Sequence, residues 1–202
     1  MERRYLDHDA AGLVFMETRE GQPVVGVRGY AAVYSTLSEN LGGFREEIAP
    51  GTFARVLGKN PDVRLTLNHD HNVVLARTKS GTLRLAADER GLLMDAPELP
   101  NTQAGRDVAE MIRRGDVSQM SFAFRNAVDK WEERAIDGQR VPVRTLTDFD
   151  LVDVAVVTYP AYEATSVALR CARESLEKWV REEKQRRNSI HCTLLRLLET
   201  MS

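Results

Sequence analysis

Long hydrophobic runs, abundant cysteine and an excess of one charge are all missing from this sequence of 202 residues. No apolar stretch approaches the ~20 residues that a membrane-spanning helix needs. Two cysteines are too few for a disulfide framework, which indicates a reducing, cytoplasmic compartment. Lysine and arginine number 28 against 30 for aspartate and glutamate, so the chain lacks the basic footprint of a nucleic-acid binder or of a protein held to anionic membranes.

The composition that remains is that of an ordinary globular protein. Apolar residues make up 43% of the chain, enough for a core that needs no disulfide or metal to hold it. The first ten residues, MERRYLDHDA, carry charge with no apolar stretch behind it, so we expect no signal peptide. The length predicts one main domain over residues 1–170 and a helical appendage over 171–202, where the sequence becomes a charged helix.

Short alternating segments dominate the first 160 residues. Helices are predicted only around 52–58, where Thr52 would cap the first turn, and over 103–114, which Gly115 would close. Strands and helices do not alternate regularly, which argues against a doubly wound parallel sheet. The predicted fold class is therefore α+β, mainly β: a barrel or sandwich with helices around it. The predicted strands lie near residues 24–33, 62–71, 82–85, 91–94, 117–128 and 151–160.

Asp153 is the most informative single residue, because it lies inside the apolar strand LVDVAVV. Burying an ionised carboxylate in such a strand costs several kcal/mol unless a partner satisfies it. Removing one member of a buried ion pair destabilises a protein by ~3–5 kcal/mol. Two interpretations remain open. Asp153 could face water on an edge strand, or it could orient a histidine in an acyl-transfer triad.

His69 continues the strand that carries Leu65 and Leu67, so the period-2 pattern places all three on one face. His71 follows at the same parity. Such a histidine can be structural, can act as a general base, or can pair with its neighbour as a zinc ligand, although zinc needs a third protein ligand. The other two histidines lie near the termini, and no metal or cofactor is predicted.

Ser121 lies in an alternating segment in which Phe122 and Phe124 face the opposite way. The nucleophile-elbow pattern G-x-S-x-G is absent, since Gln119 and Ala123 occupy the glycine positions, which argues against an α/β-hydrolase. A strand serine can still act as a nucleophile if a neighbouring histidine accepts its proton. Ser118 is the local competitor.

Five segments, taken together and in their order along the chain, resemble a known protein family more specifically than any one of them does alone. The segments lie at 29–53, 65–85, 88–102, 112–124 and 151–165, and include LTLNHDHNVVLAR, GDVSQMSFAF and LVDVAVVTYPA. In this order they resemble the tailed-phage prohead maturation protease family, over about residues 25–170. That family is similar in fold to the herpesvirus capsid maturation protease, assemblin. The resemblance implies a closed or partly open β-barrel with surrounding helices.

The resemblance also implies catalytic residues. His69 matches the histidine of the family's His-Asp segment, Ser121 its serine, and Asp153 its acidic position, where glutamate is commoner. The shorter aspartate requires its strand to approach His69 more closely. Asp148 and Asp150 lie near enough in sequence to compete for the third role. Arg113 and Arg114 could assist an oxyanion or could simply complement a helix dipole in solvent.

The implied function is a serine endopeptidase that removes the scaffolding segment of the major capsid protein inside the procapsid, in the host bacterial cytoplasm, and digests itself. Such relatives suggest a homodimer or higher oligomer, and no nucleic acid or membrane partner is expected. Two alternatives remain: a non-catalytic capsid-assembly module, and a metal-dependent hydrolase using His69 and His71. The appendage 171–202, with an apolar stripe over 190–201, would dock a partner, pack on its own domain, or serve as a packaging or self-cleavage tail.

Overall fold

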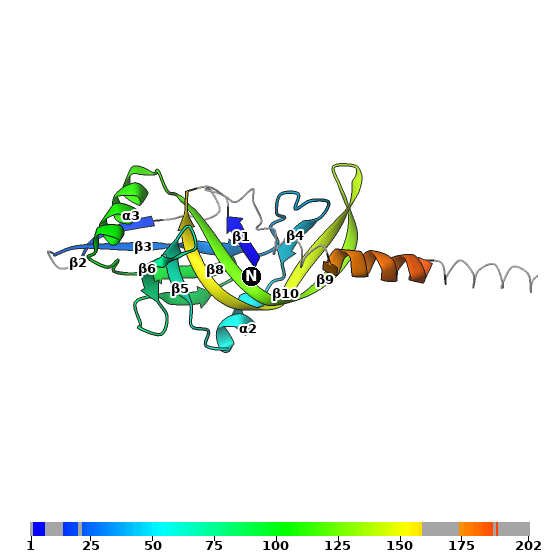
Figure 1. Ribbon diagram of the computed structural model, residues 1–202, viewed down its shortest axis with the longest axis horizontal. Coiled ribbons are helices and arrows are strands. Elements are labelled where there is room, and N and C mark those ends of the chain that lie inside the picture. The colour runs from blue at the N-terminus through cyan, green and yellow to red at the C-terminus, as the bar shows by residue number, and fades with distance from the viewer. Residues whose placement is uncertain (1, 7–13, 20–21, 159–173, 188, 190–202) are drawn as a thin grey trace, which may run out of the picture.

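The computed structural model describes residues 2–6, 14–19, 22–158, 174–187 and 189 (Figure 1). Strands predominate, as the sequence predicts, and a third helical stretch covers residues 174–187. None of the helices in these ranges has the length and apolar character needed to span a membrane. The helices are α2 (Thr52–Gly58) and α3 (Gln103–Arg114), and the strands are β1 (Glu2–Leu6), β2 (Val14–Arg19), β3 (Gln22–Val33), β4 (Arg45–Ile48), β5 (Arg64–Leu67), β6 (Asp70–Arg77), β7 (Arg84–Ala87), β8 (Gly91–Ala96), β9 (Gln119–Ile136) and β10 (Gln139–Val157).

The described strands form two sheets. One has six strands in the order β1-β9-β10-β5-β6, with β4 also pairing with β10, and the other has four in the order β2-β3-β8-β7. The mainly-β prediction is therefore confirmed. Closure into a barrel is not seen, because no described strand of one sheet is hydrogen-bonded to a strand of the other.

The core lies between the two sheets. The four-stranded sheet contributes Val27, Leu92 and Met94, and the six-stranded sheet contributes a group of phenylalanines, all at most 2% exposed. Phe122 stacks on Phe124 with ring centroids 5.4 Å apart, and Phe53 of α2 meets Phe122 edge-on at 6.1 Å. Burial of both sheets' apolar faces in one cluster explains why two separate sheets form one core.

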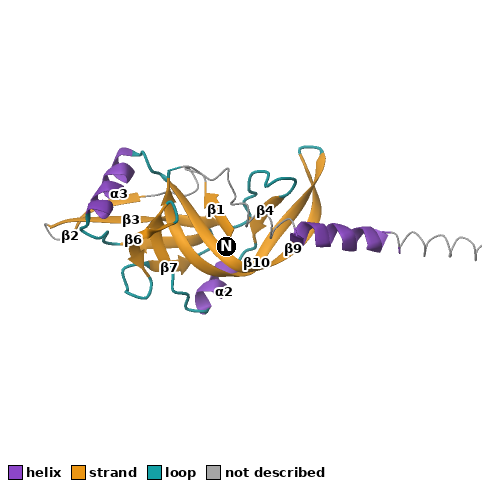
Figure 2. Cartoon of the chain, in the orientation of Figure 1, coloured by secondary structure: helices purple, strands orange, loops and turns teal. Residues whose placement is uncertain are grey.

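β9 and β10 together form a long curved ribbon (Figure 2). Asp137 and Gly138 turn between them with φ of 51° and 78°, the positive values that a two-residue hairpin loop requires. The prediction of a strand over 151–160 captured only the end of β10, which begins at Gln139. The missed part contains Pro142, a residue that argues against a strand, and charged residues such as Arg144 and Asp148.

The two predicted helices are present. Thr102 caps α3 by accepting the Gly105 N–H at 3.2 Å, and Gly115 ends it at a φ of 80°. At α2 the predicted cap is wrong. Gly51 occupies the N-cap position without a side-chain bond, and the Thr52 hydroxyl instead donates to the Leu146 carbonyl of β10 at 3.3 Å. That bond fixes α2 against the long ribbon.

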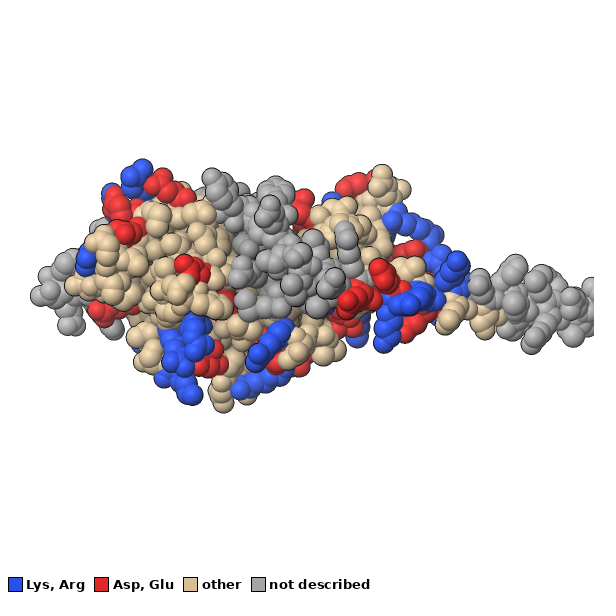
Figure 3. Space-filling model, in the orientation of Figure 1, with Lys and Arg blue, Asp and Glu red and all other residues tan. Residues whose placement is uncertain are grey.

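The helix over 174–187 lies against the far end of the ribbon. Trp131 of β9 donates from Nε1 to the Ser175 hydroxyl at 3.0 Å, and its ring stacks on Trp179 with centroids 6.1 Å apart. Arg187 pairs with Glu133 at 2.9 Å. In this region both signs of charge are interspersed on the surface (Figure 3). The apolar stripe expected over 190–201 lies outside the described residues.

Candidate active site

Alternation along β9 separates the core from a polar face. Phe122 and Phe124 are buried in the core cluster, so Ser121 and Ala123 point to the other side of the sheet. Ser121 is 0% exposed but does not lie among the phenylalanines. On β10, Ala155 is the register partner of Ser121 and shares this face. The parity that the sequence predicts for the serine therefore holds.

A β-bulge brings Asp153 to the same face. Leu151 of β10 is the register partner of Phe124 on β9, whereas Asp153, two residues later, is the partner of Ala123, the next residue along β9. The register therefore shifts by one residue between Leu151 and Asp153. Leu151 belongs to the core, as do Val154 and Val156 further along. In an unbroken strand Asp153 would share the face of Leu151; the extra residue reverses the alternation and turns the carboxylate away from the core. This resolves how an apolar strand tolerates the acid.

His69 is not on a strand, which corrects the prediction that it extends the face of Leu65 and Leu67. β5 ends at Leu67, and Asn68 and His69 form a two-residue hairpin loop with φ of 50° and 58°. Positive φ at both positions is the signature of a type I′ loop, in which asparagine is favoured. The loop is anchored on the end of β10, because Asn68 N–H donates to the Val156 carbonyl at 2.9 Å.

The three side chains meet in one hydrogen-bonded chain. His69 Nδ1 lies 2.5 Å from Asp153 Oδ1, and His69 Nε2 lies 2.5 Å from Ser121 Oγ. Because a carboxylate only accepts hydrogen bonds, Nδ1 carries the proton and Nε2 is left to accept from the serine hydroxyl. Small Ala155 lies between Ser121 and Thr66 in the sheet, which leaves room on that face for the ring to reach both partners.

The three hydrogen-bonded side chains are also almost completely buried. Ser121 is 0% exposed, Asp153 1% and His69 4%. Few waters can compete for these hydrogen bonds, and electrostatic interactions are stronger at low local dielectric. The arrangement can hold the imidazole in one tautomer, accept a proton from the hydroxyl and stabilise the imidazolium that results.

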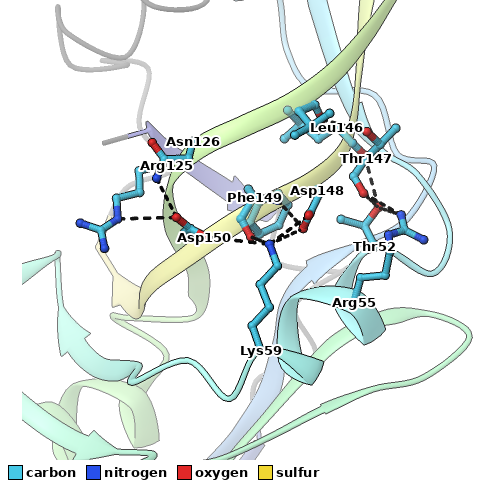
Figure 4. A network of polar contacts seen from close by, with 11 residues as sticks. Thr52, Arg55, Lys59, Arg125, Asn126, Leu146, Thr147, Asp148, Phe149 and Asp150 are labelled. Carbon is cyan, nitrogen blue, oxygen red and sulfur yellow. Dashed lines mark hydrogen bonds and ion pairs between the residues drawn. The ribbon is translucent and has the colours of Figure 1, made fainter.

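The competing acids are engaged elsewhere (Figure 4). Lys59 at the end of α2 donates to Asp148 at 2.8 Å, and Asn126 donates to Asp150 at 2.7 Å. The Lys59 ammonium beside Asp148 lowers the pKa of that carboxyl. Of the three acids considered from the sequence, the structure brings only Asp153 into hydrogen-bond contact with His69.

His71, on β6, also reaches the acid. Its Nε2 lies 3.3 Å from Asp153 Oδ2, while its side chain is 59% exposed. The two histidines thus share a carboxylate, and both ring nitrogens of His69 are already bonded to Asp153 and Ser121. No cluster of three or more metal-ligating side chains occurs among the described residues. The geometry favours a proton relay over the metal site considered from the sequence.

Other candidates lie away from this chain of contacts. Ser118 precedes β9, and the histidine bond goes to Ser121 instead. Arg113 pairs with Glu110 of its own helix at 2.5 Å, and Arg114 pairs with Asp116 at 2.9 Å. Both arginines therefore complement acids at the end of α3.

Two residues of the site were missed from the sequence. Asn68 anchors the His69 loop, and its side-chain oxygen accepts the Thr158 N–H at 3.0 Å. An Asn-His pair between two β segments could have predicted the two-residue loop, because asparagine tolerates positive φ. The contact of His71 with Asp153 has no such signal, since it depends on how β6 and β10 lie in space.

Comparison with known proteins identifies the family of this chain. The family model for caudovirus prohead serine proteases matches residues 14–180. Among solved structures, the bacteriophage T4 capsid assembly protease, gp21, aligns with 78% of this chain and 99% of its own, at 12% identity and a TM-score of 0.44. A search of curated proteins gave no significant match. Since the family model spans most of the chain, this protein belongs to the caudovirus prohead serine protease family, the serine proteases of capsid maturation.

Proposed function

We propose that this protein is a serine endopeptidase of the Ser-His-Asp type, with Ser121 as nucleophile, His69 as general base and Asp153 as the orienting acid. The observation that supports this most directly is the position of the His69 ring, which bonds Asp153 through Nδ1 and Ser121 through Nε2, each at 2.5 Å. Three residues from separate strands or loops meet on the face away from the core, where packing alone does not require them.

The mechanism follows from this order of contacts. Ser121 Oγ attacks the scissile carbonyl carbon while His69 Nε2 takes the hydroxyl proton, and the C–N bond breaks as the same proton passes to the leaving amine. Asp153 stays ionised and stabilises the imidazolium through Nδ1–H. Water then enters, gives a proton to His69 and attacks the acyl-enzyme, which releases the carboxylate product and returns the proton to Ser121 Oγ.

The substrate we propose is the major capsid protein, from which the enzyme removes a scaffolding segment inside the procapsid, within the host cytoplasm. We propose that the chain also cleaves itself. These steps rest on membership of the prohead protease family, which the match over residues 14–180 supports. We further propose that the main domain spans residues 1–170, with 171–202 as an appendage whose described part contacts Trp131 and Glu133.

The test is co-expression of the full chain with the major capsid protein of the same phage. We expect Ser121→Ala to abolish cleavage while circular dichroism and the melting temperature stay those of the native chain, and Ser118→Ala to cleave normally. A fluorophosphonate probe should label the native protein at Ser121. Cleavage by Ser121→Ala would refute the assignment of Ser121 as the nucleophile. If only Ser118→Ala lost cleavage, the nucleophile would be Ser118.

A further inference from the structure

Asp153 has two carboxylate oxygens, and the proposed mechanism uses one of them. Oδ1 bonds His69 Nδ1, while Oδ2 lies 3.3 Å from His71 Nε2. Asp153 is 1% exposed, so bulk water cannot supply partners for the second oxygen freely. A buried carboxylate that lacks a donor at one oxygen would be costly, and among the described residues His71 meets Oδ2.

The second bond also controls the orientation of the carboxylate. The terminal torsion of aspartate is broad, so a single hydrogen bond at Oδ1 does not fix the plane of the group. A second donor, at Oδ2, restricts that plane. Since a carboxylate accepts only, Nε2 of His71 must carry a hydrogen in this contact.

Other charges near His71 are committed elsewhere. Asp70, the preceding residue, accepts the Asn72 N–H at 2.9 Å. Arg64 of β5 is the register partner of Asp153 on β10, but its guanidinium donates to Asp62 at 3.3 Å. The ionisable groups that the described contacts place with His71 are therefore Asp153 and, through it, His69.

We propose that His71 is a positioning residue for the proton relay: it donates from Nε2 to Asp153 Oδ2 and so holds Oδ1 in line with His69 Nδ1. This inference rests on the proposed function. Loss of the donor should therefore loosen the carboxylate and leave Oδ1 less well aligned with His69 Nδ1.

The experiment measures the rate of fluorophosphonate labelling of the full chain at one neutral pH. Saturation kinetics separate the maximal inactivation rate from the probe's apparent affinity. The variants are His71→Ala, which removes the donor, and His71→Gln, whose amide keeps an N–H donor without the titratable ring. Val74→Thr, at an exposed position of the same strand, is the matched control.

We expect His71→Ala to lower the maximal rate about threefold to tenfold, the range for one partly exposed hydrogen bond, with probe affinity unchanged. His71→Gln should recover the native rate, and Val74→Thr should match the native chain. The inference is overturned if His71→Ala keeps the native maximal rate or changes only the apparent affinity for the probe. It is also overturned if His71→Gln and His71→Ala are equally defective. Labelling of Ser121→Ala would instead refute the proposed function itself.

Discussion

Replacing Asp153 with asparagine is the sharpest test of the relay. The amide has nearly the shape of the carboxylate, and Asp153 is 1% exposed, so bulk water has little access to this position. His71 donates to Oδ2, which favours the amide oxygen at that position and turns the amide nitrogen toward His69. Nδ1 must then accept, the ring proton moves to Nε2, and the ring can no longer take the proton of Ser121.

The expected loss follows from that change of tautomer. Mispositioning the proton of a catalytic histidine costs about a thousandfold to ten-thousandfold in turnover, which corresponds to about 4–5.5 kcal/mol in the activation free energy. The free energy of unfolding should change little, because the amide keeps the volume and one hydrogen bond on each side. Capsid-protein cleavage and fluorophosphonate labelling measure the loss, and a urea titration measures the stability.

Asp148→Asn is the matched control, since it makes the same chemical change five positions earlier on β10. Its carboxylate pairs with Lys59, whose side chain is 45% exposed, so we expect near-native activity. Native turnover in Asp153→Asn would refute the reasoning, as would an equal loss in Asp148→Asn.

Three further expectations concern stability. The Arg77 guanidinium lowers the pKa of Asp62 to about 2. The pair therefore stabilises the fold above pH 3.8 and loses that contribution as the pH falls toward 2. Asp62→Asn should flatten the pH dependence of urea unfolding in this window. Phe122→Ala should cost about 3–5 kcal/mol of unfolding free energy, read from the urea midpoint, because the ring is 2% exposed within the aromatic cluster. Trp179→Ala should cost about 1 kcal/mol or less and make the helix over 174–187 more susceptible to trypsin, since the indole stacks on Trp131; an unchanged digestion pattern would contradict that docking.

The alternation of apolar residues was enough to predict the class of fold and the side of β9 that carries Ser121. Local patterns failed where pairing in space decides the outcome. The bulge before Asp153 reverses the strand's parity, and no sequence rule applied to LVDVAVV alone predicts it. His69 was placed on a strand because its parity matched Leu65, whereas the positive φ of Asn68 and His69 ends the strand two residues earlier.

The residues of the site were identified mainly through a family resemblance, and the structure adds the reason they can meet. Asp153 reaches His69 although aspartate is shorter than glutamate, because the Asn68 N–H ties the hairpin loop to Val156 of the same strand. That tie brings the ring to the acid. Such a contact joins residues 88 positions apart, so it is invisible to any local pattern.

The pairing of β1 has a consequence for how a polypeptide reaches Ser121. Tyr5 of β1 is the register partner of Ser121, and β10 occupies the other side of β9. Each side of a strand can form one ladder of backbone hydrogen bonds, so both sides of the serine's strand are taken. A peptide therefore cannot extend this sheet at the serine while β1 is in place; it must either displace those few N-terminal residues or approach across the face of the sheet.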